Sequence, residues 1–413
     1  MTRQYRILCA LGLTTALLSV AIAERAIAGP YSIDILIQPY HPGLVDSWLN
    51  DINDQGLSTG YTIENSGAGP VRTAVTYRDG NTQTLSTRSS LDINNLGDVV
   101  GNDSNFQPHF VAADGPAVPI EVAGYGTFLF SQGCLNDSGN VLTQIFVNDP
   151  LDAPPNAFSG LAIWNQGGAA PLSALDPLYP YVYPPDPYNF DSGPSSSSYT
   201  SNVTNLNNAN QFAAGIHGSD YDPMDPENFD DDVFNDYYTN AYIYDGQGGY
   251  SLLESPTLGE EIRPIDIDEA GTVLGSVGDQ LALWGPDGAL QSVLPDSGTA
   301  LNVLGFNGYP SVQRNSLGQV VAVTLAGGVM FYNPVSNAWT DITPSISGLG
   351  TGTFSSIQGF NDLGQFVGLV RPPQGGGIFG YVVSPVPEPG SMTVAAGLLG
   401  SLACCRKRYR RGQ

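Results

Sequence analysis

The chain has few of the residues from which most catalytic and metal sites are built. Its 413 residues include three histidines and a single lysine, Lys407. The histidines, His41, His109 and His217, form no metal-ligand spacing, so we interpret each as a structural or surface residue. Neither a P-loop nor an H-E-x-x-H motif occurs. These two catalytic signatures are therefore absent.

Cysteine is equally scarce. Cys9, Cys404 and Cys405 lie near the two ends of the chain, which leaves Cys134 alone in the body. The body therefore has no internal disulfide, and a hydrophobic core must stabilise it. We expect Cys134 to be a small buried hydrophobic residue and not a reactive thiol.

Positive charge is also in short supply. The chain has 14 Lys and Arg residues against 39 Asp and Glu, a formal net charge of −25. Without the two ends, the basic residues are Arg72, Arg78, Arg88, Arg263, Arg314 and Arg371. So acidic a body repels nucleic acid and anionic lipid, because phosphate binding depends on Lys and Arg. Its expected partners are cations, neutral or basic glycans, or basic proteins.

The N-terminal segment has the three parts of a secretory signal peptide. Arg3 and Arg6 precede an apolar region, residues 7–20, and small residues follow up to Ala23 or Ala28. This order is typical of export signals that are removed. We predict a signal peptide over residues 1–28, with cleavage after Ala28.

The C-terminal segment, residues 387–413, also has three parts. A short motif of Pro387, Glu388 and Pro389 is followed by an apolar stretch, residues 392–405. A basic run then forms a membrane stop at Arg406, Lys407, Arg408, Arg410 and Arg411. The segment resembles the PEP-CTERM sorting signal read by exosortases, which are membrane transpeptidases. The resemblance covers this tail alone, and it implies an exported protein held transiently in the membrane.

The apolar stretch is short for a transmembrane helix. At 1.5 Å per residue its 14 residues give about 21 Å of helix, against a hydrocarbon core of roughly 30 Å. The following positive charges hold that end in the cytoplasm. A short span with an immediate stop favours a processed segment, although an ordinary C-terminal anchor is the alternative.

The body contains a motif that recurs seven times. Each copy has an apolar residue, then Asn or Asp, two variable residues and Gly, followed by a short apolar run. The copies start at Ile52-Asn53, Ile93-Asn94, Leu135-Asn136, Leu206-Asn207, Ile267-Asp268, Arg314-Asn315 and Phe360-Asn361. The fourth copy has Asn210 in place of Gly, and the sixth begins with Arg314. Such a repeat indicates one structural unit per copy.

The motif has the chemistry of a β-hairpin turn. An Asn or Asp side chain can bond its own downstream backbone, and Gly adopts the positive φ that the turn needs. Asn210 is the next most tolerant residue for that conformation. A third, aromatic strand and usually a fourth follow each hairpin, such as Leu281–Trp284 and Leu290–Leu294. Seven four-stranded units predict an all-β, seven-bladed propeller over residues 29–386.

The seventh unit has no fourth strand of its own, whereas residues 31–37 form a strand before the first unit. We predict that this N-terminal strand pairs with residues 379–383 and closes the ring, which removes two exposed edges. From about Tyr31 to Val383 the pattern resembles the HAF repeat of extracellular bacterial proteins. That resemblance implies architecture and compartment, with little about mechanism.

Two long insertions interrupt the repeat, at about residues 149–200 and 220–240. The first is rich in Tyr and Pro, and the second in carboxylates and aromatic rings. Carboxylates can hold Ca²⁺ and aromatic rings can stack on sugars. The candidate ligand or metal residues of the second insertion are Asp225, Glu227, Asp230, Asp231, Asp232 and Asp236. The alternative is an ordinary solvated loop, since the spacing matches no EF-hand.

Three functions remain after these exclusions. The first is a non-enzymatic binding or structural propeller at the cell surface or in the extracellular matrix, among exopolysaccharides or other surface proteins. The second is a carbohydrate-active hydrolase or lyase that uses carboxylate pairs, such as Glu260 with Glu261 or Asp266 with Asp268. The third is a calcium-dependent adhesin. No cofactor other than calcium is expected.

Overall fold

The computed structural model describes residues 30–36, 44–113, 115–130, 133–147, 159–166, 168–172, 199–219, 237–256, 260–303, 311–371 and 377–386. The predicted signal peptide and sorting tail lie outside these ranges. No helix among the described residues is long and apolar enough to cross a membrane.

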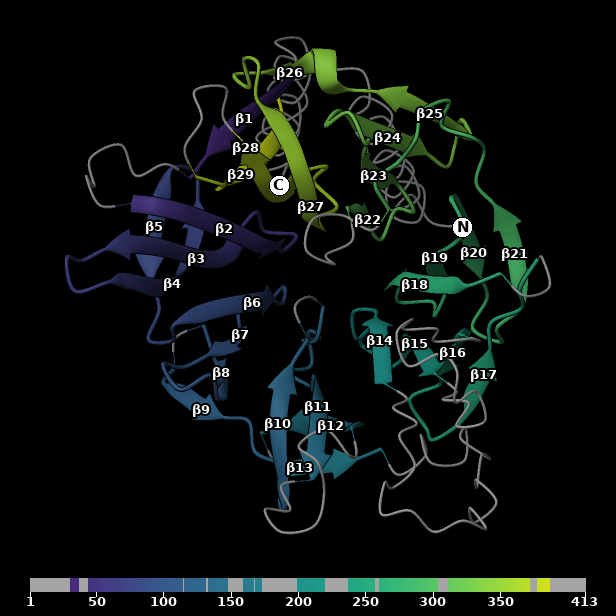
Figure 1. Cartoon of the computed structure of the whole chain (residues 1–413), viewed down its shortest axis with the longest axis horizontal. Coiled ribbons are helices and arrows are strands. Elements are labelled where there is room, and N and C mark those ends of the chain that lie inside the picture. Colours follow the sequence, from purple (N-terminus) through teal and green to yellow (C-terminus); the bar gives the residue numbers. More distant parts are fainter. Residues whose placement is uncertain are drawn as a thin grey trace, which may run out of the picture.

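Seven β-sheets stand around a central axis (Figure 1), and each has four antiparallel strands in chain order, apart from the strands that complete the seventh. The predicted all-β, seven-bladed propeller is therefore confirmed. Blade 1 contains β2 (Leu44–Ile52), β3 (Ser58–Asn65), β4 (Pro70–Arg78) and β5 (Asn81–Thr84). Blade 2 contains β6 (Ser89–Ile93), β7 (Val99–Asn102), β8 (Pro108–Val111) and β9 (Ala117–Pro119).

The next four blades repeat this order. Blade 3 contains β10 (Tyr125–Leu129), β11 (Val141–Val147), β12 (Ser159–Asn165) and β13 (Gly168–Pro171). Blade 4 contains β14 (Tyr199–Val203), β15 (Phe212–Ser219), β16 (Tyr237–Tyr244) and β17 (Tyr250–Leu252). Blade 5 contains β18 (Ile262–Ile267), β19 (Val273–Val277), β20 (Gln280–Trp284) and β21 (Leu290–Val293). Blade 6 contains β22 (Val312–Arg314), β23 (Val320–Val323), β24 (Val329–Asn333) and β25 (Ala338–Asp341).

Blade 7 combines the two ends of the body. Its strands are β27 (Thr353–Phe360), β28 (Phe366–Arg371), β29 (Phe379–Pro385) and β1 (Tyr31–Ile35). β1 pairs antiparallel with β29, from Tyr31 opposite Pro385 to Ile35 opposite Tyr381. The prediction that the N-terminal strand closes the ring is thus confirmed, and purple β1 lies beside yellow β29 in Figure 1. The short strand β26 (Ile346–Ser347), after the 3₁₀ turn η2 (Thr343–Ser345), adds a parallel fifth strand outside β1.

The third strand of each blade supplies large side chains to the core, as the aromatic pattern predicts. These buried residues are Tyr77, Phe110, Trp164, Tyr244, Trp284, Tyr332 and Tyr381. Some pack across blade boundaries: the rings of Phe110 and Trp164, from blades 2 and 3, lie 5.7 Å apart. Burying a large apolar side chain stabilises a fold by about 1.5–3 kcal/mol, so these contacts are a main source of cohesion between the sheets.

The strand order gives the ring two distinct faces. The Asn turns connect the first and second strands of every blade, so all seven lie on one face, which we call the turn face. The connections between third and fourth strands lie on this face too. The connections between second and third strands, and those between blades, leave from the opposite face.

The predicted insertions leave from the opposite face of neighbouring blades 3 and 4. β12 and β13 fall within the first predicted insertion, which leaves residues 148–158 and 173–198 as separate segments. The second insertion is shorter than predicted, because β16 already begins at Tyr237. Both sets of inserted residues, including the acidic run from Asp225 to Asp236, lie outside the described ranges.

Candidate functional site

Each Asn turn is held by its own side chain. In the first turn, Asn53 Oδ1 accepts hydrogen bonds from the backbone N–H groups of Gln55 and Leu57, both at 3.0 Å. Gly56 has a φ of 75°, and in the fourth turn Asn210 takes the same conformation with a φ of 62°. The predicted turn chemistry is therefore confirmed, including the substitution of Gly by Asn.

The other half of the Asn side chain joins neighbouring blades. Asn53 Nδ2 donates to the backbone carbonyl oxygen of Asn94, the equivalent residue of the next turn, at 2.9 Å. The same bond recurs from Asn94 to Asn136, Asn136 to Asn207, Asn207 to Asp268, Asn315 to Asn361 and Asn361 to Asn53. The last of these joins the final blade to the first. We call this series the turn belt.

A second series of bonds runs beside the turn belt, one residue further along each turn. The backbone N–H of Asp54 donates to Asn95 Oδ1 at 2.8 Å. Equivalent bonds run from Asn95 to Asp137, Asp137 to Asn208, Asn208 to Glu269, Ser316 to Asp362 and Asp362 to Asp54. These residues are variable in the motif, yet each supplies a side-chain acceptor or a backbone donor.

The junction between blades 5 and 6 is different. Among the described residues, neither series joins these two turns, and Asp268 has no side-chain N–H to donate. Arg314, at the end of β22 in blade 6, connects the two blades instead. Its Nη2 lies 3.2 Å from Asp268 Oδ2 and donates to the carbonyl oxygen of Thr272 at 2.7 Å. Its Nε lies 3.7 Å from Asp266 Oδ2. An ion pair thus replaces the amide bond at this junction.

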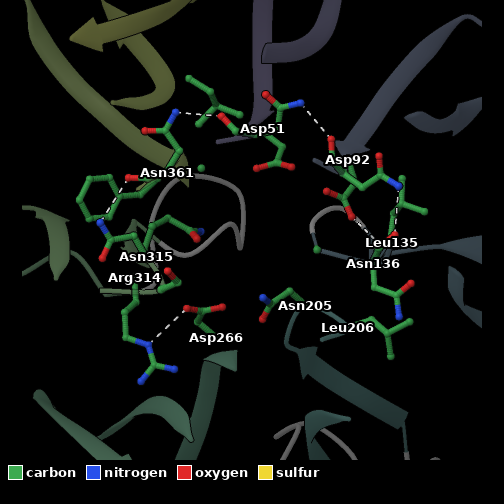
Figure 2. Close-up of a pocket in the computed structure, with 18 of the residues that line it drawn as sticks. Asp51, Asp92, Leu135, Asn136, Asn205, Leu206, Asp266, Arg314, Asn315 and Asn361 are labelled. Carbon is green, nitrogen blue, oxygen red and sulfur yellow. Dashed lines mark hydrogen bonds and ion pairs between the residues drawn. The ribbon is translucent and has the colours of Figure 1, made fainter. Parts of the chain in front are cut away.

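A cavity of about 600 Å³ lies where the turns surround the central axis. Its lining includes Asp51, Asp92, Asn205 and Asp266, each two residues before a turn Asn or Asp. Figure 2 shows the side chains of Asp51, Asp92 and Asp266 around this space. Asp51, Asp92 and Asp266 lie in the first strands of blades 1, 2 and 5, and Asn205 follows the first strand of blade 4, so the ring brings them together.

A β-bulge before the turn produces this arrangement in several blades. The register shifts between Leu49 and Asp51 in β2, and between Ser90 and Asp92 in β6. A bulge rotates the following side chain, here toward the cavity. The second strand must approach closely at this point: a Cβ on Gly101 would lie 1.9 Å from the carbonyl oxygen of Ser89. Gly101 is therefore a strand residue required by the bulge, whereas Gly97 belongs to the turn.

Asp51 and Asp92 form an interacting acid pair. Burial and the neighbouring Asp92 charge raise the pKa of Asp51 well above its usual value, and burial raises the pKa of Asp92. Asp92 Oδ2 also accepts the backbone N–H of Leu135 at 2.6 Å, and Asp51 Oδ2 accepts that of Ile93 at 3.2 Å. Two carboxyl groups that interact in this way favour a state in which they share one proton.

Asp266 is the third acid of the cavity. Burial raises its pKa to about 6, an effect that the nearby positive charge of Arg314 only partly offsets. Its Oδ1 accepts the backbone N–H of Ile267 at 2.9 Å. Like Asp51 and Asp92, it is engaged with the backbone while it faces the cavity.

The residues singled out in the sequence fall in different places. Asp266 and Asp268 do come together, at Arg314. Glu261 instead forms an ion pair with Arg263 at 2.7 Å, and Glu260 is exposed. His109 lies near the surface, with its Nδ1 3.0 Å from the carbonyl oxygen of Gln107.

Cys134 is fully buried, as predicted, and burial raises the pKa of its thiol well above the ordinary value. No group of three or more His, Cys, Asp or Glu side chains in the described part of the chain is placed to hold a metal ion. The structure therefore supplies no metal centre within those ranges.

Asp51 and Asp92 were missed as a pair because they are 41 residues apart in the chain. One signal could have found them: when the seven copies are aligned on the turn Asn, the position two residues earlier is Asp or Asn in four copies. A polar residue that recurs at the end of an apolar strand indicates that this position faces the same interior space in several blades.

No protein-family model and no curated protein matches the sequence. Similar solved structures include a virginiamycin B lyase from Staphylococcus aureus, with 8% identity and a TM-score of 0.44, covering 86% of this chain and 100% of that one. An oligogalacturonate lyase from Vibrio parahaemolyticus has 7% identity and a TM-score of 0.48, over 86% and 94% of the two chains. A gluconolactonase from Xanthomonas campestris has 11% identity and a TM-score of 0.33, over 87% and 97%. Similarities this weak carry no argument about chemistry.

The ion pair at the junction of blades 5 and 6 predicts a rescue. Asp268→Asn or Arg314→Leu alone is expected to lower the free energy of unfolding by about 2–3 kcal/mol, because each removes one member of an ion pair in which the Arg314 side chain is buried. The double variant restores the Asn and the apolar residue of the other turns, so its loss should be smaller than the sum. Chemical denaturation measures all three. Arg263→Leu, which breaks a more exposed pair, is the control and should cost less than about 1 kcal/mol. If the loss in the double variant equals the sum of the two single losses, the replacement of the amide bond by the ion pair is contradicted.

Asp266 predicts a pH dependence of stability. Its pKa is about 6 in the folded protein against 3.8 for the free side chain. The folded protein thus binds this proton more tightly than the unfolded chain, so the stability contributed by Asp266 falls as the pH rises from about 4 to 6. Relative to Asp266→Asn, the wild type should lose on the order of 2–3 kcal/mol over this range. Urea denaturation of both proteins at pH 4, 5, 6 and 7 tests this, and a constant difference would refute it.

Proposed function

We propose that the chain is an exported propeller that acts without catalysis, as a binding or structural protein of the cell surface or extracellular matrix. An N-terminal leader directs export. An exosortase-type transpeptidase then recognises Pro387, Glu388 and Pro389 while the segment 392–405 is in the membrane and the basic run from Arg406 to Arg411 stays in the cytoplasm. The envelope, the outer surface and the extracellular space are the destinations that fit this route.

One observation supports the non-catalytic part of this proposal. The polar residues that recur in every blade serve the ring itself: the turn Asn residues hold their own turns and the next blade. The acids of the cavity likewise accept backbone N–H groups. Both sets of polar groups therefore have an architectural explanation.

The sorting route is tested by the ends of the mature protein. Mass spectrometry of the protein recovered from the producing cells should find an N-terminus at Gly29 and a C-terminus that has lost the apolar tail. A membrane-bound chain that still ends at Gln413 would instead indicate an ordinary anchor. Pro387→Ala with Pro389→Ala is the matched control, and it should accumulate as the unprocessed form.

A glycan-active enzyme is the second candidate, and the acid cluster of the cavity is the observation that favours it. Asp51, Asp92 and Asp266 face one space, and their pKa values are all raised. A carboxyl group that keeps its proton near neutral pH is what a general acid requires. This candidate would place the chemistry on the axis of the ring.

Incubation with the producer's own exopolysaccharide separates the two functions. For the exported protein we expect co-sedimentation with the polymer and no shortening of its chains by size-exclusion chromatography. Chain shortening that disappears in Asp51→Asn would establish the enzyme instead. Repeating the sedimentation with calcium or a chelator tests the adhesin, whose acidic residues 225–236 would make binding depend on the metal.

A further inference from the structure

The two ends of the described body emerge together on the turn face. The backbone N–H of Val386 donates to the carbonyl oxygen of Pro30 at 2.8 Å. The end of β29 is also tied to a turn, because Gln365 Nε2 donates to Ser384 Oγ at 3.0 Å. Gln365 directly follows the turn of Asn361. Both the proposed leader and the proposed tail therefore join the propeller at this face.

The connection from the propeller to the apolar tail is short. Residues 387–391 separate Val386 from Met392. The six Cα–Cα steps from Val386 to Met392 span at most about 22 Å when fully extended, and the two prolines favour an extended chain. A membrane that holds residues 392–405 is thus within this distance of the point where the tail leaves blade 7.

From this geometry we propose that the turn face lies against the lipid bilayer while the tail is inserted, and that the opposite face points away from it. This orientation rests on the proposed membrane insertion of the tail. It gives the cavity and the insertions different surroundings: the acid-lined cavity opens toward the membrane side, and the insertions of blades 3 and 4 depart on the far side.

The side chains at the tips of the turns are compatible with a nearby bilayer. Leu96, Leu317 and Leu363 occupy the same position of their turns, and all three are exposed. Val335, between β24 and β25, and Val386 are exposed on this face too. Aliphatic side chains in such positions can contact the interfacial region of a membrane.

The charges of the same face limit the strength of this contact. Asp54, Asp137, Glu269 and Asp362 stand beside the leucines in the second series of bonds. Carboxylates repel an anionic bilayer surface. The tether therefore holds the face in place, and removal of the tail would release the propeller. A lasting lipid-binding surface would carry Lys and Arg instead.

Two exposed leucines in the neighbouring blades 6 and 7 form a matched pair for a test. Leu363 lies on the turn face and is 55% exposed, whereas Leu325 lies between β23 and β24 on the opposite face and is 70% exposed. Cysteines at these sites can be labelled selectively, since Cys134 is fully buried and the terminal cysteines can be changed to serine. The full chain, made in a host that exports it, is placed in phosphatidylcholine vesicles with a fluorescent acceptor on some headgroups.

Energy transfer from the donor dye to the headgroups should be at least about twofold higher for Leu363→Cys than for Leu325→Cys, because a strand of several residues separates the two faces at about 3.3 Å per residue. In a chain that also carries Leu398→Asp and Leu399→Asp, flotation with the vesicles and the transfer at both sites should be lost.

Equal transfer at the two sites, or higher transfer at Leu325, would overturn the orientation while leaving the sorting proposal intact. If energy transfer is equal at the two sites and size-exclusion chromatography shows a dimer, the turn face is instead the surface that contacts a second copy of the chain. Failure of the unmodified tail to float with vesicles would overturn both the orientation and the proposed insertion.

Discussion

The ring depends on the side-chain amides of the turn Asn residues, in which the oxygen and the nitrogen bond different partners. The oxygen of each turn Asn fixes its own hairpin, and the nitrogen bonds the backbone of the next hairpin. A side-chain amide carries an acceptor and a donor on the same planar group, and of the two amide residues only Asn is short enough for the turn. Local structure and blade-to-blade contact are thus set by the same residue. The bond from Asn361 to Asn53 extends this arrangement across the closure.

Much of this architecture could be predicted because its causes are local. The motif identifies the turn, the aromatic run identifies the third strand, and the strand missing from the seventh unit points to residues 31–37, of which Tyr31–Ile35 form β1. The bonds between blades could not be predicted in the same way, since Asn53 and Asn94 are 41 residues apart and Asn361 and Asn53 are 308 apart. No short-range pattern records which turn lies beside which.

The candidate site shows the same limit. Asp266 and Asp268 attracted notice because they are close in sequence, whereas the Asp51 and Asp92 pair exists only after blades 1 and 2 are placed side by side. Arg314 was visible as an exception to the apolar position, and Asp268 as an exception to Asn. Their connection needed the structure, which shows that the two departures occur at one junction and compensate each other.

The carboxyl groups of the cavity also bond the backbone, and this limits which ligands the cavity can bind. A carboxylate that accepts a backbone N–H in the next blade, as Asp92 does from Leu135, contributes to the cohesion of the ring. To act as a base, or to bind a cation, it must share or give up that bond, and the cost is about that of a charge-assisted hydrogen bond, roughly 1.5–3 kcal/mol. A ligand of the cavity therefore has to compete with the fold. Neutral polar ligands, which can bond the remaining lone pairs without displacing the backbone, meet this condition more easily than ligands that require free carboxylates.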